Sequence, residues 1–529
     1  MLLDSLLEQD ASALLRVLAY ALPILILLPI LLTAIYNLYL HPLRHLPGPF
    51  LSRALPFPHA LRIISGSGHT TVHQLHEHYG PVVRIGPDHV SYTDPRAWRD
   101  IFGHRAGEGL QGREENPKAR LFYAAQIIER EGDVPNILTA DREEHGRLRR
   151  AVAAGFSERA MREQEDSIKG YVDLLVERLR GQSERGNEVD MATWYNWTTF
   201  DVVGDLVFAE SFGCLDRGRS HQFVDLVTGI AKQSAWFTAM KYVGMHKVPG
   251  FKRALNIVVR WLAADSFSGM QKNMLDKLRH RLAVKEERSD LFEGLVSKRE
   301  EWNLTENHLQ SNATLLAAAG SETTASLLSG VTYHILANPA VLARLTHEVR
   351  TAFTHSSDIT IAAVSRLPYL LACLNEALRR HPPTLSNLPR EAHEGGESIV
   401  GDWVPQGTVL EIQQYAMNHS SQHWHDAMEY RPERWLNKFI NDVSGETVDM
   451  GEKDVDGDRL EVMQTFSVGP RNCVGRNLAY AEMRLILARM VFEFDMELSE
   501  SSKDWKQKMQ GFTIWEKRPL LVRLTPVKR

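Results

Sequence analysis

The chain has 529 residues, of which 43% are apolar and 24% are charged, a composition typical of a folded protein. This composition excludes a disordered, collagen-like or disulfide-rich chain. The 61 Lys and Arg residues against 66 Asp and Glu residues give a net charge of −5, which excludes a dedicated nucleic-acid-binding protein. The three cysteines, Cys214, Cys373 and Cys473, are too few for a secreted disulfide framework and favour a reducing compartment.

The N-terminal region contains an apolar segment without a charged side chain, residues 17–40. A helix of that length spans about 36 Å, enough to cross a hydrocarbon core of about 30 Å. The alternative is a cleaved signal peptide, whose apolar part is only about 7–15 residues long and leads to a small-residue cleavage site. Because this segment is longer and leads into a Pro-rich stretch, we predict a transmembrane anchor.

The charges around this segment predict its orientation. Arg44 and further arginines follow it, whereas Arg16 is the one nearby basic residue before it. By the positive-inside rule, residues 1–16 form a short lumenal terminus and the large C-terminal part faces the cytosol. Beyond the anchor we predict a Pro-rich hinge over residues 41–50 and one large domain over residues 51–529.

Most of this domain has the periodicity of helices. Residues 172–179 and 335–345 are examples, while extended runs at residues 81–85 and 404–410 predict strands and turns. The acidic stretch at residues 441–458 is typical of a solvated loop. We therefore predict a mainly α fold with small β-sheets.

One pattern points to a nucleotide site. Residues 107–112 match Gly-x-Gly-x-x-Gly, which binds a dinucleotide only between a buried strand and a helix N-terminus. The preceding residues 94–105 are charged and look helical, so we interpret the match as a loop. Any reducing power must then come from a partner protein.

A second pattern, the four histidines His69, His73, His76 and His78, could indicate a metal site because the first three share a helix face. However, no thiol or supporting carboxylate is clearly placed beside them. An ordinary apolar stripe runs along the same segment, so we predict surface histidines on an amphipathic helix.

The segment FSVGPRNCVG, residues 466–475, combines Phe, Gly, Arg, Cys and Gly at offsets that chance produces on the order of once in ten thousand sequences. A thiolate that binds haem iron must be held on a Gly-rich loop whose backbone approaches the ring closely. Backbone N–H groups tune the sulfur, and Arg471 can pair with a haem propionate. A helix predicted over residues 478–492 places Cys473 near an N-terminus that stabilises a thiolate. We prefer this interpretation to a buried structural cysteine.

With this loop, the chain resembles the haem-thiolate monooxygenases, the cytochromes P-450, over essentially its whole length after the anchor. The resemblance implies the P-450 fold for residues 51–529, with haem b as the cofactor and Cys473 as the axial ligand of its iron. In the family, a His or Trp and an Arg four residues later hold a propionate, and a further Arg binds the other. The residues implied to bind the haem are His145, Arg149, Arg390, Arg471 and Cys473.

Residues 319–324, Ala-Gly-Ser-Glu-Thr-Thr, resemble the family's oxygen-activating segment within a long helix predicted over residues 306–337. Cleavage of dioxygen requires two protons in an otherwise dry pocket, and a carboxylate beside a hydroxyl can deliver them. We therefore expect Glu322 to relay protons and Thr323 to hydrogen-bond the oxygen and a water. Gly320 is expected to leave room for oxygen.

Glu376 and Arg379 resemble the family's Glu-x-x-Arg pair, with both charges on one helix face. The Pro-Glu-Arg-Trp segment at residues 432–435 supplies Arg434, which is implied to complete a buried charge triad that fixes the cysteine loop. We expect a structural role, because removal of one member would leave a buried charge unpaired.

The resemblance implies a monooxygenase of the endoplasmic reticulum membrane that uses dioxygen to oxidise an apolar small molecule. Its electrons would come from NADPH-cytochrome P-450 reductase, docked near Arg147, Arg150 and Arg476, with cytochrome b5 as a further donor. Two alternatives stay open: a haem-thiolate isomerase, dehydratase or coupling enzyme, and a non-catalytic haem sensor or carrier. The Glu322–Thr323 pair argues against the sensor and only weakly against the other reactions.

Residues 36–49 and 98–104 resemble microsomal members of the family from filamentous fungi, with the trichothecene-type hydroxylases the most similar. This implies a role in secondary-metabolite or mycotoxin biosynthesis, on a polyketide, terpenoid or alkaloid intermediate. By position in the family, substrate contacts are expected from residues 107–134, 237–251, 317–318, 385–388 and 512–514.

Overall fold

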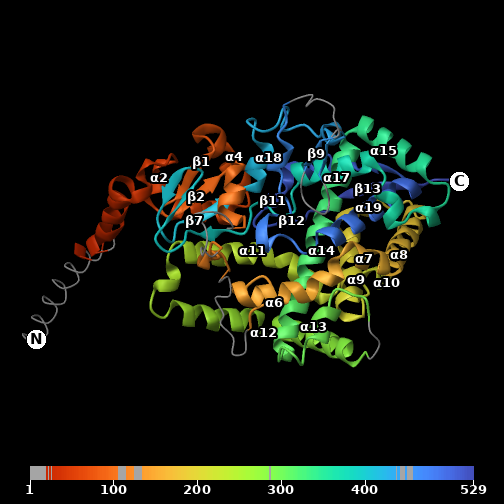
Figure 1. Cartoon of the computed structure of the whole chain (residues 1–529), viewed down its shortest axis with the longest axis horizontal. Helices are drawn as coiled ribbons and strands as arrows, with labels where there is room; N and C mark the ends of the chain where they lie inside the picture. The colour runs from red at the N-terminus through yellow and green to blue at the C-terminus, as the bar shows by residue number, and fades with distance from the viewer. Residues whose placement is uncertain are drawn as a thin grey trace, which may run out of the picture.

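The computed structural model describes residues 20–21, 23–25, 27–104, 115–123, 134–284, 288–436, 438–440, 447–449 and 457–528. This part of the chain is mainly α-helical with small sheets, as predicted (Figure 1). The Gly-x-Gly-x-x-Gly match and most of the predicted acidic loop lie outside the described residues.

The long helices form most of the body. They are α4 (Gly68–Tyr79), α6 (Arg142–Ala153), α8 (Glu165–Glu184), α9 (Met191–Phe208), α11 (Gln222–Tyr242), α12 (Phe251–Ala283), α14 (Glu306–Ala337), α15 (Pro339–Ala352), α17 (Pro368–Arg380) and α19 (Arg476–Glu493). The shorter helices are α2 (Phe50–Ala54), α3 (Phe57–Ser65), α5 (Arg120–Tyr123), α7 (Glu158–Glu163), α10 (Cys214–Arg217), α13 (Glu293–Ser297), α16 (Ile361–Val364), α18 (Gln414–His419) and α20 (Trp505–Lys508).

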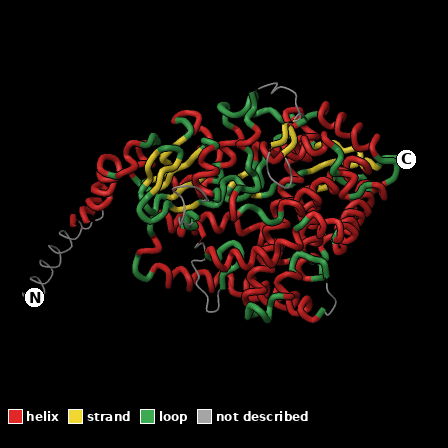
Figure 2. The backbone as a smooth tube through the Cα atoms, viewed as in Figure 1, coloured by secondary structure: helices red, strands yellow, loops and turns green. Residues whose placement is uncertain are grey.

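The strands gather in a few places between these helices (Figure 2). They are β1 (Val82–Gly86), β2 (His89–Tyr92), β3 (Val189–Asp190), β4 (Arg390–Glu391), β5 (Glu397–Ile399), β6 (Asp402–Val404), β7 (Val409–Ile412), β8 (Lys438–Ile440), β9 (Thr447–Asp449), β10 (Phe494–Leu498), β11 (Gln510–Gly511), β12 (Trp515–Glu516) and β13 (Leu521–Pro526). One sheet has the order β1-β2-β7-β4, in which β2 and β7 are parallel, and another has the order β10-β13-β3. The strands predicted near residues 81–85 and 404–410 are therefore confirmed.

Helix α14 is the central element and packs against α9, α17 and α19. Its start is stabilised by a capping box, in which Thr305 and His308 each accept a hydrogen bond from the other's backbone amide. It ends before Asn338 because Pro339 cannot continue the helical hydrogen bonds. The predicted bounds of α14 are confirmed, and the periodicity at residues 335–345 belongs to two successive helices.

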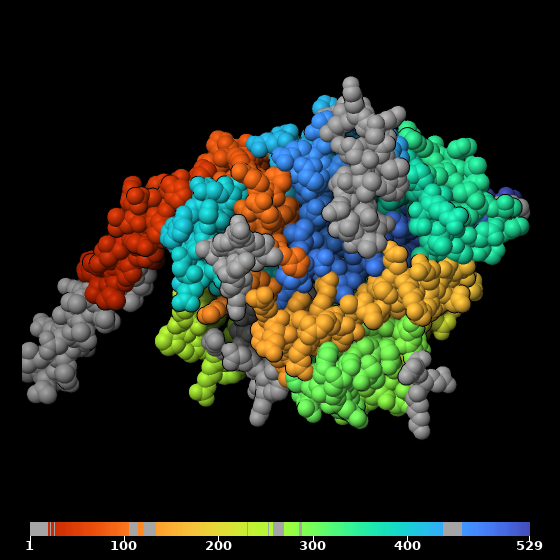
Figure 3. Space-filling model, viewed as in Figure 1, coloured from red at the N-terminus to blue at the C-terminus, as the bar shows by residue number. Residues whose placement is uncertain are grey.

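The apolar N-terminal segment projects from the body (Figure 3). Over the described residues, Pro23–Leu40 forms a helix long and apolar enough to cross a membrane. Most of its side chains are exposed, among them Leu25 at 72% and Leu31 at 57%. A helix that exposes apolar side chains all round suits a lipid environment better than water.

The prediction of surface histidines on α4 is wrong for three of the four, although His78 is exposed as predicted. His69, His73 and His76 are all less than 10% exposed because α18 and the β11–β12 region cover this face. The His69 ring packs edge-on against Tyr415 and Trp515, and His76 hydrogen-bonds through both of its ring nitrogens. Among the described residues, no group of three metal-ligating side chains forms a metal site.

Candidate active site

Cys473 lies in the loop between the short 3-10 helix Gly469–Arg471 and α19. Its amide donates to the Phe466 carbonyl oxygen at 2.8 Å, which closes the loop. Gly469 has a φ of +77°, and a Cβ there would lie 1.9 Å from the Phe102 carbonyl oxygen. Glycine is therefore required for this close approach. Cys473 has accessible surface, unlike the other two cysteines, Cys214 and Cys373, which are buried.

Opposing effects act on the Cys473 thiol. Burial raises its pKa, whereas a hydrogen bond from the Gly475 amide and the charges of Arg149 and Arg476 lower it. Burial is the larger effect, so the pKa lies above its ordinary value. The helix N-terminus does favour the thiolate through Gly475, as predicted, but it does not outweigh burial.

Arg149 of α6 holds the residue that precedes this cysteine. Its guanidinium donates to the Asn472 carbonyl oxygen and, at 2.6 Å, to the Asn472 side-chain oxygen. His145 lies one helical turn earlier and is 6% exposed. Burial and the charges of Arg471 and Arg149 lower the pKa of His145 to about 4. The ring is therefore neutral at pH 7 and can donate one N–H to an anion.

Arg471 belongs to a group of cations on the same side of the loop. Its guanidinium pairs with the Glu115 carboxylate at 2.5 and 2.9 Å and donates to the Ala140 carbonyl at 3.0 Å. Lys118 donates to the same carbonyl at 2.6 Å. Burial, Arg471 and Arg390 lower the pKa of Lys118 to about 7. Burial is the main cause of both low pKa values, and the charges of the neighbouring arginines add to it. These arginines can attract anionic groups.

A cavity of about 780 Å³ borders these charges and is lined in part by Glu115, His145 and Arg149. Arg390 of β4 is 6% exposed, and its guanidinium lies 5.6 Å from the centre of the Phe102 ring, beside the cysteine loop. The four residues predicted to bind the propionates therefore gather around this loop.

Glu322 and Thr323 point to different sides of α14. Thr323 and Ala319, one turn apart, both have accessible surface, and the Thr323 hydroxyl donates to the Ala319 carbonyl at 2.8 Å. Glu322 is 4% exposed, and its carboxylate pairs with the Lys517 ammonium at 3.0 Å. The structure thus places Thr323 on an open helix face and Glu322 on a buried one.

The expectation that Gly320 leaves room for oxygen is wrong. A Cβ at this position would lie 3.2 Å from Val203 of α9, so the missing side chain faces a neighbouring helix. Thr199 of α9 donates to the Ser321 carbonyl at 3.0 Å at the same contact. Gly320 therefore permits close packing of α9 on α14.

Glu376, Arg379 and Arg434 meet in the interior, each with a side chain no more than 1% exposed. Arg379 pairs with both Glu376 carboxylate oxygens, at 2.7 and 2.9 Å, and Arg434 donates to one of them at 3.2 Å. The Trp435 indole donates to the other at 2.9 Å, and Arg434 also pairs with buried Asp458. The structure brings the predicted triad together and adds Trp435 and Asp458 to it.

Comparison with known proteins decides the family. The model of the cytochrome P-450 family matches residues 47–523, nearly the whole domain after the apolar segment. The chain belongs to the cytochrome P-450 family. It has the predicted fold. Its relatives are named as monooxygenases and hydroxylases, so the chain is a monooxygenase.

This P-450 is similar to several fungal enzymes over almost its full length. It is 43% identical to the cytochrome P-450 monooxygenase tpeC of Talaromyces stipitatus, over 94% of this chain and 93% of the relative. It is 39% identical to the trichothecene C-15 hydroxylase of Fusarium sporotrichioides, over 94% and 96% of the two chains, and 38% identical to the averantin hydroxylase of Dothistroma septosporum, over 95% and 90%. The prediction that trichothecene-type hydroxylases are the most similar is wrong, because tpeC shares more residues with this chain.

The residues around the loop fit the haem that the family implies. Cys473 offers an accessible sulfur, Gly469 lets the loop pass close under Phe102, and a cationic group suits two propionates.

Sequence analysis missed several residues of this P-450's site. They are Glu115, Lys118, Asp458 and Lys517. None of them belongs to a motif, and each lies far along the sequence from the residue that it contacts. Their positions in the site therefore depend on the fold.

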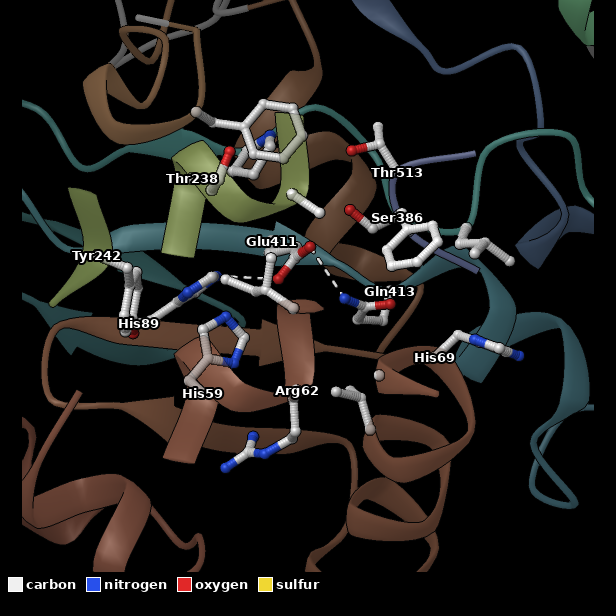
Figure 4. Close-up of a pocket in the computed structure, with 18 of the residues that line it drawn as sticks. His59, Arg62, His69, His89, Thr238, Tyr242, Ser386, Glu411, Gln413 and Thr513 are labelled. Carbon is white, nitrogen blue, oxygen red and sulfur yellow. Dashed lines mark hydrogen bonds and ion pairs between the residues drawn. The ribbon is translucent and has the colours of Figure 1, made fainter. Parts of the chain in front are cut away.

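A second cavity, of about 100 Å³, lies beside α3 and α11 of this P-450 (Figure 4). Residues 237–251, 385–388 and 512–514, which were predicted to contact substrate, all contribute to its lining. On its wall, His89 pairs with Glu411 at 2.9 Å, as the dashed line in Figure 4 marks. Three of the segments predicted to contact substrate therefore line one cavity.

Glu482 of α19 is fully buried and lies against Thr324 of α14. Burial raises its pKa from an ordinary value of 4.5 to about 8, and contact with Thr324 offsets only part of the increase. Between these two pH values the folded protein holds a proton that the unfolded chain releases, so stability falls as pH rises.

Substitution of Glu482 by glutamine is therefore expected to raise the thermal unfolding temperature at pH 7. The gain corresponds to as much as about 3 kcal/mol and should shrink toward zero near pH 4.5. Thermal unfolding of both proteins at several pH values between 4.5 and 8 measures it. Parallel curves for the two proteins would contradict the raised pKa.

Proposed function

We propose that this P-450 is a single-pass protein of the endoplasmic reticulum membrane that hydroxylates or otherwise oxidises an apolar secondary metabolite. The domain at residues 51–529 would face the cytosol and act on a polyketide, terpenoid or alkaloid intermediate. The observation that carries the proposal is the accessible Cys473 residue beside the charges of Arg149 and Arg476, with Arg390 and Arg471 together near Lys118 on the same side of the loop. The names of the relatives, which include a trichothecene hydroxylase and an averantin hydroxylase, support the class of substrate.

In this proposal, Cys473 ligates the haem iron, and His145, Arg149, Arg390 and Arg471 hold the propionates. The bound haem supplies the oxidising chemistry, with dioxygen as co-substrate. Arg149 has a second task, because its hydrogen bonds to Asn472 keep the cysteine loop in place.

Two further groups of residues support the chemistry. The Thr323 hydroxyl, on the open face of α14, would hold a water and pass protons, with Glu322 as their source. The triad of Glu376, Arg379 and Arg434 would fix the segment that leads to the cysteine loop, since all its charges are buried and paired.

Electrons would come from NADPH-cytochrome P-450 reductase, with cytochrome b5 as a further donor. Arg150 is exposed on α6, next to the residues that hold the cysteine loop. A basic surface there suits acidic groups of a flavoprotein. The apolar helix Pro23–Leu40 supports attachment to a membrane, into which an apolar substrate partitions.

Replacement of Thr323 with alanine is expected to leave the bound haem unchanged while product formed per NADPH falls by about tenfold or more. The remaining electrons should appear as peroxide, because protons no longer reach oxygen in order. Thr324→Ala is the matched control, since this hydroxyl is buried and donates to the Gly320 carbonyl. NADPH, peroxide and product are measured in the reconstituted system, and unchanged coupling would remove Thr323 from proton delivery.

The experiment that tests the function starts from deletion of the gene. The metabolite that accumulates is purified and incubated with this P-450, the reductase and ¹⁸O₂. We expect a product with one ¹⁸O atom. Conversion without label would favour isomerisation, dehydration or coupling, and the absence of both accumulation and conversion would contradict an enzymatic role.

A further inference from the structure

The cavity of about 100 Å³ beside α3 and α11 has three polar side chains on its wall that are almost completely buried (Figure 4). They are His59 of α3, His89 of β2 and Glu411 of β7, which are 6%, 5% and 5% exposed. Much of the remaining wall is apolar and includes Ile63, Val72, Phe122, Leu385 and Phe512. A buried polar group in such a wall costs free energy unless it is hydrogen-bonded.

The strands bring Glu411 and His89 to the cavity. Val409, Glu411 and Gln413 all line it, as expected because residues two apart share one face of an extended chain. His89 is paired in register with Val409, so its ring lies diagonally opposite Glu411 on the neighbouring strand. Neither His89 nor Glu411 belongs to the segments from which substrate contacts were expected.

The Glu411 carboxylate has one oxygen engaged and one available. The Gln413 amide donates to Oε1 at 2.9 Å, on one side of the carboxylate in Figure 4. On the other side, His89 Nε2 lies 2.9 Å from Oε2, but neither atom has a well-oriented hydrogen bond among the described residues. The Nδ1 atoms of His59 and His89 are likewise buried without a hydrogen-bond partner in this part of the chain. A bound polar group would satisfy these atoms.

The charges on the wall favour a neutral polar group. Burial alone would raise the pKa of Glu411, but the charge of His89 and hydrogen bonds hold this pKa below its ordinary value, so the carboxylate is ionised at pH 7. Burial lowers the pKa of His59 well below its ordinary value, so this ring is neutral. The Glu411 carboxylate repels an anion, and the Arg62 guanidinium on the same wall disfavours a cation. A hydroxyl group is uncharged, donates to a carboxylate and accepts from an imidazole N–H.

We propose that Glu411 and His89 form a subsite that recognises a hydroxyl group on an otherwise apolar substrate, and this rests on the proposed function. The hydroxyl donates to Glu411 Oε2 and accepts from an imidazole N–H, while the apolar wall contacts the adjoining carbon atoms. The space holds one end of a substrate, since a cavity of about 150 Å³ holds a single benzene ring. Pro389 of the wall directly precedes Arg390, so the rest of the molecule can extend toward the haem-binding cations.

The first test measures binding and needs no natural substrate. Full-length holoprotein in one detergent is dialysed against 2-naphthol or its methyl ether, 2-methoxynaphthalene, as wild type, Glu411→Gln and Glu411→Leu. Because the ether cannot donate a hydrogen bond, we expect the wild type to prefer 2-naphthol by about tenfold or more. Glu411→Gln should keep a smaller preference, and Glu411→Leu should lose it.

Glu397→Gln is the matched control for this test, because Glu397 is also 5% exposed but lies in β5, outside the lining of the cavity. It should keep the preference of the wild type. Equal binding of the two probes by the wild type, as expected for a cavity that holds only water, would overturn the proposal. An unchanged preference in the Glu411 variants would overturn it as well.

The second test uses the metabolite purified from the deletion strain, together with the reductase. We expect this metabolite to carry a hydroxyl group, and we expect Glu411→Gln to raise KM by about tenfold with little change in kcat, because Glu411 acts on binding. An unchanged KM, or a metabolite without a hydroxyl group, would overturn this inference alone. An inactive wild type would contradict the proposed function instead, and the dialysis test would still decide whether the subsite exists.

Discussion

Replacement of Cys473 with serine is expected to abolish the long-wavelength Soret band that the reduced wild-type protein shows with carbon monoxide. That band depends on a thiolate ligand that pushes electron density toward the iron, and a serine hydroxyl does not do so. Product formation should be lost with it. The spectrum is recorded on purified protein after reduction, before and after carbon monoxide is added.

Cys214→Ala and Cys373→Ala are the matched controls, because both thiols are fully buried and raised in pKa by burial. Both variants should keep the band if they retain haem. A wild-type band typical of histidine ligation would remove Cys473 from its role, and so would an unchanged band in Cys473→Ser.

The cysteine loop could be predicted because its chemistry is local. The Gly469 turn, Arg471 and Cys473 lie within five residues, and each is needed for a reason that the sequence itself displays. The bounds of α14 were predictable for a similar reason, since the cap at Thr305 and the proline at 339 are local signals.

Contacts between distant segments were not predictable. The periodicity of α4 showed where its apolar stripe runs, but not that Tyr415 and Trp515 would cover His69. Likewise, the sequence placed Glu322 beside Thr323, but the direction of each side chain depends on what packs against α14. Gly320 belongs to the same class, because Val203 on α9 explains it.

The charges around the haem site show the same limit. His145 and Arg149 were predictable from the resemblance to the family, in which a His and an Arg at this spacing hold a propionate. Lys118 and Glu115 were not, because their meeting with Arg471 depends on how a connection folds back over the cysteine loop. A single sequence shows which charged residues are present, but only the fold shows which of them lie together in a region of low dielectric constant.

Replacement of Arg434 with methionine is expected to lower the free energy of unfolding by about 3–5 kcal/mol. Arg434 is the cation between two buried carboxylates, those of Glu376 and Asp458. Glu376 would keep Arg379, whereas among the described residues Asp458 would keep a single hydrogen bond, from the His425 amide. Most of the loss should therefore come from Asp458, which the sequence did not place in the triad.

This reasoning predicts a rescue. In the double variant Arg434→Met/Asp458→Asn, the carboxylate that loses its cation is replaced by a neutral amide. At least about 1 kcal/mol of the lost stability should therefore return. Arg431→Met is the matched control, because its pair with exposed Asp426 contributes at most about 1 kcal/mol. Denaturant unfolding of the four proteins measures these differences. If Asp458→Asn gave no rescue, the lost stability would have to come from Glu376, and Asp458 would contribute nothing to it.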